Sequence, residues 1–216
     1  MKLRNDIKDF LSNIPSNVTL VAATKYCTSE EMIPLLDNGI NNFGENRVEP
    51  FLEKYEALKD KDIIWHFIGH LQRNKANKII DKIDYLHSLD SLDLARLINE
   101  KRTKPLNVFI EVSINLEESK NGVKPENVEE FIKEILKYKN INVVGLMMMS
   151  IKASEHNSLN DQFSKLVELK NKLENKLNIS IPYLSMGMSD DYKEAIDNHT
   201  THIRLGRILF DGYEHY

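Results

Sequence analysis

Short apolar runs alternate along the chain with longer stretches in which apolar side chains recur every three or four residues. The short runs are rich in β-branched and aromatic residues, which is typical of strands. They predict eight strands, over residues 18–24, 42–44, 63–69, 85–89, 106–113, 143–149, 183–186 and 202–205. Strands separated by helices in this way indicate a parallel sheet.

The longer stretches predict amphipathic helices. Their apolar residues form three stripes with helical spacing, at Leu94, Leu97 and Ile98, at Val128, Phe131, Ile132, Ile135 and Leu136, and at Leu159, Phe163, Leu166, Leu169, Leu173 and Leu177. Ser91 and Ser158 stand where helix N-caps are expected. A further amphipathic helix opens the chain and ends at Pro15.

Eight strand–helix units predict one domain over residues 1–216, an α/β fold in the form of a closed (β/α)₈ barrel of the TIM type with an extra N-terminal helix. The chain is shorter than the roughly 250 residues typical of this fold. Too few residues follow the last strand for a full eighth helix, so we expect the N-terminal helix to fill part of its place. An open doubly wound sheet is the alternative. The lack of a Gly-x-Gly-x-x-Gly fingerprint after the first strand disfavours it.

Composition narrows the functional classes. Of the 216 residues, 41% are hydrophobic and 29% charged, and the formal net charge of −4 argues against nucleic-acid binding by phosphate neutralisation. Cys27 is the single cysteine, so no intramolecular disulfide can form. The sequence has neither the apolar core of a signal peptide nor the roughly 18 consecutive apolar residues of a membrane helix. We therefore expect a cytoplasmic protein that does not act on membranes.

A lysine follows the first predicted strand directly. The apolar run LVAAT ends in Lys25, and burial of an ammonium group is costly. One interpretation is a lysine that extends to solvent. The other is a Schiff-base lysine, whose pKa falls on desolvation so that its neutral amine can attack an aldehyde.

Polar and glycine residues also follow the later strands, where barrel enzymes gather their chemistry. Asn46 comes after the second strand, and Gly206 with Arg207 after the eighth. Ser185 lies at the end of the seventh strand, and Gly187 and Ser189 follow it. Loops after strands seven and eight recurrently bind phosphate in this fold. Since a closed barrel places strands one and eight side by side, a cofactor with an aldehyde and a phosphate would span the site. Asp190 and Asp191 follow at the start of the next predicted helix. They fit a simple helix-capping role equally well, which is the alternative to an anion site there.

A metal site is not expected. His66 and His70 are four residues apart, but a strand end separates them, so they lack the geometry of a helical metal-binding pair.

These residues form a recognisable set. The segments AATK, FGEN, WHFIGHLQRNK, GLMMMS, SMGMSDD and RLGR, in register over nearly the whole chain, resemble the pyridoxal phosphate homeostasis protein family. The resemblance implies a single barrel similar to the N-terminal domain of alanine racemase. It also implies pyridoxal 5′-phosphate (PLP) as the cofactor, and a role in vitamin B6, amino-acid and keto-acid balance without an established reaction.

The resemblance also implies roles for individual residues. Lys25 would hold PLP as an internal aldimine, and Asn46 would lie beside the ring. The phosphate would be held, largely by backbone N–H groups, at Ser185, Met186, Gly206 and Arg207. Arg204 would face the pyridine nitrogen and leave it unprotonated, because arginine keeps its proton in proteins. The ring would then be a weak electron sink.

Two positions depart from the family pattern. Arg207 replaces a small hydroxyl residue and Asp211 replaces a glycine, and both changes bear on phosphate affinity. We expect a non-catalytic PLP carrier or regulator, in monomeric form, with PLP-dependent apoenzymes or amino and keto acids as partners. A weakly active PLP-dependent racemase or lyase is one alternative. A Schiff-base aldolase that uses Lys25 without PLP is another.

Overall fold

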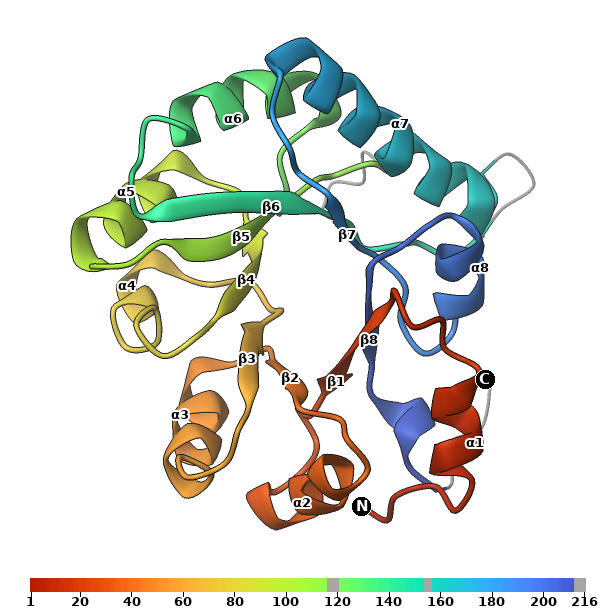
Figure 1. The fold of residues 1–216 in the computed structure, drawn as a ribbon. Coiled ribbons are helices and arrows are strands. Elements are labelled where there is room, and N and C mark those ends of the chain that lie inside the picture. Colours follow the sequence, from red (N-terminus) through yellow and green to blue (C-terminus); the bar gives the residue numbers. More distant parts are fainter. Residues whose placement is uncertain (116–120, 154–156, 212–216) are drawn as a thin grey trace.

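Eight parallel strands close into a barrel in chain order, β1 to β8 (Figure 1). The computed structural model describes residues 1–115, 121–153 and 157–211. The strands are β1 (Thr19–Ala23), β2 (Asn42–Glu45), β3 (Ile64–Phe67), β4 (Tyr85–Leu89), β5 (Leu106–Glu111), β6 (Ile141–Met147), β7 (Tyr183–Ser185) and β8 (His202–Leu205). All eight predicted strands are present, and the pairing of β1 with β8 closes the barrel, so the predicted TIM-type fold is confirmed.

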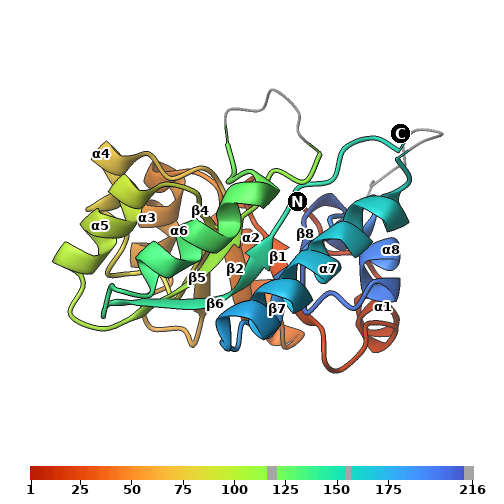
Figure 2. The same cartoon turned by 90° about the horizontal axis from the view of Figure 1, so that it is seen from above.

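Helices form a ring outside the strands (Figure 1). They are α1 (Ile7–Ser12), α2 (Ser29–Asp37), α3 (Val48–Ala57), α4 (Arg73–Ala76), α5 (Leu92–Lys101), α6 (Val128–Ile135), α7 (Leu159–Leu177) and α8 (Tyr192–Asp197), with 3₁₀ turns η1 (Pro125–Asn127) and η2 (Arg207–Leu209). The turned view shows α6 and α7 lying across the outside of β6 (Figure 2). The three predicted apolar stripes lie on α5, α6 and α7, although Leu136 falls just beyond α6 and is 53% exposed.

The predicted N-caps are confirmed. Ser91 accepts a hydrogen bond from the backbone N–H of Leu94, and Ser158 accepts one from Asp161. Each cap satisfies a backbone donor that has no partner inside its helix, which typically contributes about 1 kcal/mol.

The N-terminal segment packs against the end of the barrel, as predicted. Leu3 forms an antiparallel bridge with Phe210, and Phe10 of α1 contacts the ring of Tyr192 on α8 at 6.0 Å between centroids. Figure 1 shows α1 beside η2 and α8, where a helix after β8 would otherwise lie. The chain's first helix thus packs beside α8 and the segment that follows β8.

Two different cores lie on the two sides of the strands. Between strands and helices the core is aliphatic and aromatic, with fully buried residues such as Phe43, Phe51 and Phe163. Each such side chain contributes roughly 2–3 kcal/mol through burial. Inside the barrel, where branched aliphatic residues usually dominate, the rings of His66, Tyr85, His87, Phe109, Tyr183 and His202 contact one another.

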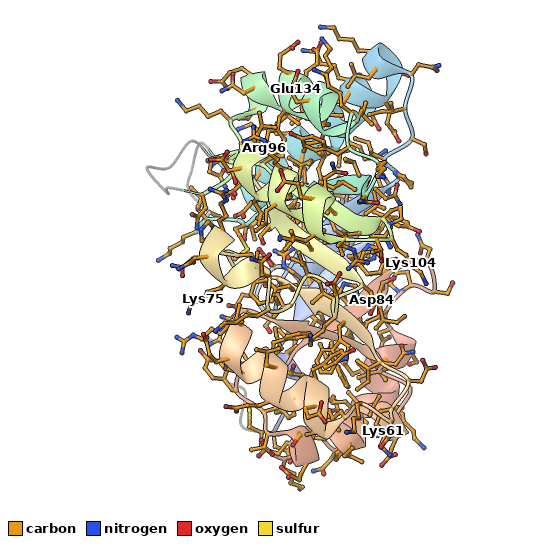
Figure 3. All side chains as sticks on the ribbon, turned by 90° about the vertical axis from the view of Figure 1, so that its left-hand side faces the viewer. Lys61, Lys75, Asp84, Arg96, Lys104 and Glu134 are labelled. Carbon is orange, nitrogen blue, oxygen red and sulfur yellow. The ribbon has the colours of Figure 1, made fainter. Side chains whose placement is uncertain are left out.

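The outer surface is charged. Lys75 on α4, Arg96 on α5 and Glu134 on α6 lie on the helical face turned to the viewer in Figure 3. Among the helices of the described residues, none is both long and apolar enough to span a bilayer.

Candidate functional site

A cavity of about 370 Å³ opens at the carboxyl ends of the strands. Its walls combine three cationic side chains, two carboxylates, two hydroxyls and three methionines with backbone from several strand ends. The lining residues used below are Ala23, Lys25, Tyr26, Asn46, Gly69, Glu111, Met147, Met149, Ser189, Asp190, Arg204, Gly206 and Arg207. Five of the seven residues that the sequence analysis singled out therefore meet around one cavity, and Ser185 and Met186 do not line it.

Lys25 follows β1 and reaches the cavity as an exposed side chain. Its ammonium lies 4.9 Å from the centre of the Tyr26 ring, and within the described ranges its side chain makes no hydrogen bond or ion pair. Within the described residues no carboxylate pairs with this amine, so it is accessible to an electrophile that enters the cavity.

A buried ion pair fixes the backbone on which Lys25 stands. The Lys54 ammonium lies 2.6 Å from a carboxylate oxygen of Glu45 and donates to the carbonyl oxygen of Thr24 at 2.7 Å. The Thr24 hydroxyl donates to the same Glu45 oxygen at 2.5 Å. Because Thr24 precedes Lys25 and Glu45 precedes Asn46, this clamp ties together the ends of β1 and β2.

Cys27 packs near this clamp as a buried thiol. Burial raises the pKa of Cys27 to about 11, because the apolar surroundings disfavour the thiolate. The side chain is therefore an unreactive part of the core.

Asn46 owes its place to a close approach of two strand ends. A Cβ atom at Gly69 would lie 2.4 Å from the backbone oxygen of Asn46, closer than any side chain tolerates. Glycine at this position lets the segment after β3 pass against Asn46 and keeps Asn46 on the cavity wall.

Arg204 forms the floor of the cavity and is 4% exposed. Its guanidinium donates to the Ser185 hydroxyl at 2.6 Å and to the carbonyl oxygen of Met148 at 3.0 Å. Burial lowers the pKa of Arg204 to about 10, and the nearby Asp191 and Glu111 carboxylates oppose this. The guanidinium therefore stays charged at neutral pH. Among the described residues no carboxylate is close enough to form an ion pair with it.

Ser185 and Met186 lie below the cavity. The Ser185 side chain is fully buried and its hydroxyl is shared between Arg204 and His87. The Met186 N–H donates to the carbonyl oxygen of His202 in the strand ladder. Neither residue is among those that line the cavity, and their predicted role toward a phosphate stays a prediction.

The loops after β7 and β8 form the remaining wall. The Ser189 hydroxyl accepts the N–H of Gly206 at 3.4 Å, and Arg207 pairs with Asp190 at 3.1 Å. Gly187 has a φ of +98° and faces Ala195 at a distance that no Cβ could share, so this loop requires glycine. Asp211 lies outside the cavity, where it pairs with Lys2.

This geometry can be compared with known proteins. The family model of the alanine racemase N-terminal domain matches residues 2–214. A pyridoxal phosphate homeostasis protein from Aquifex aeolicus is 41% identical over 194 residues, which cover 88% of this chain and 85% of that protein. One from Schizosaccharomyces pombe is 39% identical over 201 residues, covering 90% and 84%. The chain belongs to the pyridoxal phosphate homeostasis protein family.

A solved structure supports the same assignment. PipY of Synechococcus elongatus, with PLP bound, superposes with a TM-score of 0.85 at 27% identity and covers 94% of this chain and 99% of that one. The fold and the family predicted from the sequence motifs are thus confirmed.

Glu111 is a further residue of the cavity wall, and it was not predicted from the sequence. It ends β5, lines the cavity and is partly buried. Burial raises the pKa of Glu111 to about 7, and the charge of Asp90 adds to this, whereas Arg204 opposes it. The sequence did contain a signal, because Glu111 follows the apolar run from Val108 to Ile110 at the carboxyl end of the strand.

Proposed function

We propose that this protein binds PLP with the aldehyde carbon joined to the Lys25 nitrogen, in a condensation that releases water. The observation that carries the proposal is that Lys25 and Arg204 face one cavity from two hydrogen-bonded neighbouring strands, β1 and β8. A lysine without a counter-ion beside a buried cation is a donor set suited to a ligand with an aldehyde and acceptor atoms. The related PipY structure has PLP bound.

The remaining lining residues orient the cofactor in this proposal. Asn46 lies beside the ring. The phosphate is held where the β7 and β8 loops meet, by Ser189, the backbone at Gly206 and Arg207, which all line the cavity. In this proposal Ser189 has the phosphate-binding role that the family resemblance implied for Ser185 and Met186, because Ser189 lines the cavity and they do not. The Arg207 charge compensates for the small hydroxyl residue that it replaces.

Arg204 decides the kind of chemistry in this proposal. PLP, when bound, serves as an electron sink, and its strength depends on a protonated ring nitrogen. Arg204 donates hydrogen bonds but does not surrender its proton at neutral pH. Facing the ring nitrogen, it leaves that atom unprotonated, which favours a non-catalytic carrier. Lys25 is exposed, so the cofactor remains within reach of amines, such as those of amino acids or of PLP-dependent apoenzymes.

The test is PLP titration of three proteins, the wild type, Lys25→Ala and Lys61→Ala. Lys61 is an exposed lysine just before β3, at the opposite end of the barrel. The wild type and Lys61→Ala should develop a visible band at one PLP per chain, and Lys25→Ala should not. A visible band of equal strength in Lys25→Ala would contradict the proposal.

Glu111 favours a second candidate function, a weakly active PLP-dependent racemase or lyase. Such a reaction needs a second proton-transferring group besides Lys25, and a carboxyl with a pKa of about 7 in the cavity is suited to that task. Amino-acid turnover by the loaded wild type that falls about 100-fold in Glu111→Gln would favour this candidate. No turnover across an amino-acid panel would favour the carrier.

A further inference from the structure

A chain of hydrogen bonds runs through the barrel interior from the cavity floor toward the opposite end. It starts at Arg204, which donates to the Ser185 hydroxyl at 2.6 Å. Ser185 bonds to Nδ1 of His87 at 2.7 Å, and Nε2 of His87 bonds to Nδ1 of His66 at 2.9 Å. Nε2 of His66 bonds to Oδ1 of Asn42 at 2.9 Å. Five side chains from β2, β3, β4, β7 and β8 are thereby connected.

The two histidines in this series of hydrogen bonds, His66 and His87, are neutral. His66 and His87 have no exposed surface, and burial lowers the pKa of each well below its usual range. For His87 the charges of neighbouring groups, including Arg204, add to the effect. Each imidazole therefore has one N–H donor and one bare nitrogen acceptor.

One direction of donation satisfies every group. Arginine can only donate, so the Ser185 oxygen accepts from Arg204. Within the described residues, Nδ1 of His87 is the one acceptor that the Ser185 hydroxyl contacts, so the hydroxyl proton points to that nitrogen. His87 must then carry its proton on Nε2 and donate to His66. His66 in turn donates from Nε2 to Asn42. The reverse direction would leave a fully buried hydroxyl proton without an acceptor, which is costly.

This direction has an electrostatic consequence. Every donor in the chain points away from Arg204, and every acceptor lone pair points toward it. The aligned dipoles present their negative ends to a buried guanidinium that has no ion-pair partner in the described part of the protein. In a dry interior such oriented dipoles act strongly, and their effects reinforce one another along a chain.

We propose that Ser185, His87, His66 and Asn42 form a directional relay of positioning residues that holds Arg204 charged and aimed at the cofactor's ring nitrogen. The relay replaces a carboxylate, which would neutralise Arg204 and draw it away from the ligand. The part that concerns the ring nitrogen rests on the proposed PLP binding. The part that concerns the relay stands on the protein alone.

The surroundings of the relay are consistent with fixed tautomers. Tyr85 of β4 stacks on His66 at 4.7 Å between ring centres, and Phe109 of β5 stacks on His87 at 4.4 Å. His202 of β8 lies 6.2 Å from His87, and burial lowers the pKa of His202 to about 4. Tyr183 of β7 packs against His202 in turn. Among the described residues, Arg204 is the charged group that forms a hydrogen bond with a member of the relay.

The first experiment is histidine ¹⁵N NMR on the protein without cofactor. His66 and His87, assigned by loss of their signals in His66→Gln and His87→Gln, should be protonated at Nε2 and bare at Nδ1. Their signals should not change between about pH 5.5 and about pH 8, where an ordinary histidine titrates. Protonation at Nδ1 in either residue, or titration near the usual histidine pKa, would overturn the relay.

The second experiment compares Ser185→Ala with Thr200→Val. Thr200 is also a buried hydroxyl, but it bonds to backbone carbonyl groups and not to Arg204. Exchange of the Arg204 guanidinium protons with water should accelerate at least about tenfold in Ser185→Ala and stay near the wild-type rate in Thr200→Val. Equal rates in the two variants would contradict the positioning role.

Cofactor binding separates the two parts of the proposal. PLP affinity should fall about tenfold in Ser185→Ala and much less in Thr200→Val, because one charge-assisted contact that aims Arg204 is lost. If the wild type binds no PLP, the proposed function is wrong. The NMR and proton-exchange experiments still test the relay in that case, because neither needs the cofactor. If PLP binds but Ser185→Ala binds it as tightly as wild type, the assignment of Arg204 to the ring nitrogen is overturned.

Discussion

Two cations that line the cavity, Lys25 and Arg204, are supported in opposite ways. Lys25 is exposed, and its support reaches it through the backbone, from a buried ion pair between Lys54 and Glu45. Arg204 is buried, and its support acts on the side chain itself, through neutral hydroxyl and imidazole groups. Both supports are buried polar assemblies, yet one is built from charges and the other from dipoles.

The difference follows from what each cation has to do. A lysine that reacts with an aldehyde must lose its proton, and a carboxylate beside its amine would oppose this. The clamp therefore holds the Thr24 carbonyl and leaves the Lys25 amine alone. Arg204 has to stay protonated without pairing with a carboxylate, and oriented dipoles stabilise its charge in this way. Breaking each support in turn tests the contrast.

The largest effect is expected from the charged support. Lys54→Met leaves the Glu45 carboxylate buried without its counter-ion, which should cost about 3–5 kcal/mol in the free energy of unfolding, measured by urea denaturation. The double variant Lys54→Met/Glu45→Leu should recover most of the loss. The matched control Lys133→Met breaks a solvent-exposed helix pair with Glu129 and should leave the free energy of unfolding nearly unchanged. Equal losses for the two methionine variants would show that the clamp is not a buried pair in solution.

A smaller effect is expected from the neutral support. His87→Leu leaves the Ser185 hydroxyl proton and Nδ1 of His66 without partners, which should cost about 2–3 kcal/mol in the same assay. Because no full charge is left unpaired, the loss should be below that of Lys54→Met. A larger loss would mean that the relay, and not the clamp, is the more strongly coupled assembly.

A third ionisable residue of the cavity, Glu111, should make the free energy of unfolding depend on pH. Its pKa of about 7 in the folded protein lies above the usual value of an unfolded glutamate, so the folded state keeps the proton longer. This group therefore destabilises the fold increasingly as pH rises from about 4.5 to about 7, and by a constant amount above that. Glu111→Gln should remove about 1–3 kcal/mol of this pH-dependent loss, seen as a flatter stability profile. An unchanged profile would show that Glu111 is ionised normally.

The smallest effect belongs to the exposed pair between Arg207 and Asp190. Both side chains are more than half exposed, so solvent screens their attraction. Asp190→Asn should change the free energy of unfolding by less than about 0.5 kcal/mol. PLP affinity should stay the same or rise slightly, since a negative charge near the proposed phosphate site is removed. A fall in affinity would place Asp190 among the binding groups.

The sequence predicted the fold well because the fold depends on periodicity. The eight apolar runs became eight strands, and the N-caps at Ser91 and Ser158 are where local chemistry placed them. Helix edges were less certain. Leu136 fits the apolar spacing of α6 but lies beyond its end and is exposed, because the stripe does not show where packing against the barrel stops.

The site was only partly predictable. Residues directly after a strand, such as Lys25 and Gly206, reach the cavity because strand ends define its rim. Ser185 also ends a strand, but pairing places it opposite His202, two residues before Arg204, and so below the cavity floor. The depth of a residue in a barrel depends on the stagger between strands, which a single sequence does not reveal. The link between His66 and His87 was missed for the same reason.

The most direct test of the account is to find where PLP attaches. The protein saturated with PLP would be reduced with borohydride, digested and analysed by peptide mass. We expect the visible band to bleach and a pyridoxyl group to appear on Lys25, at about one per chain, and to be absent from Lys25→Ala. A reduced adduct spread over several surface lysines, or no adduct at Lys25 in a protein that binds PLP, would contradict the central claim.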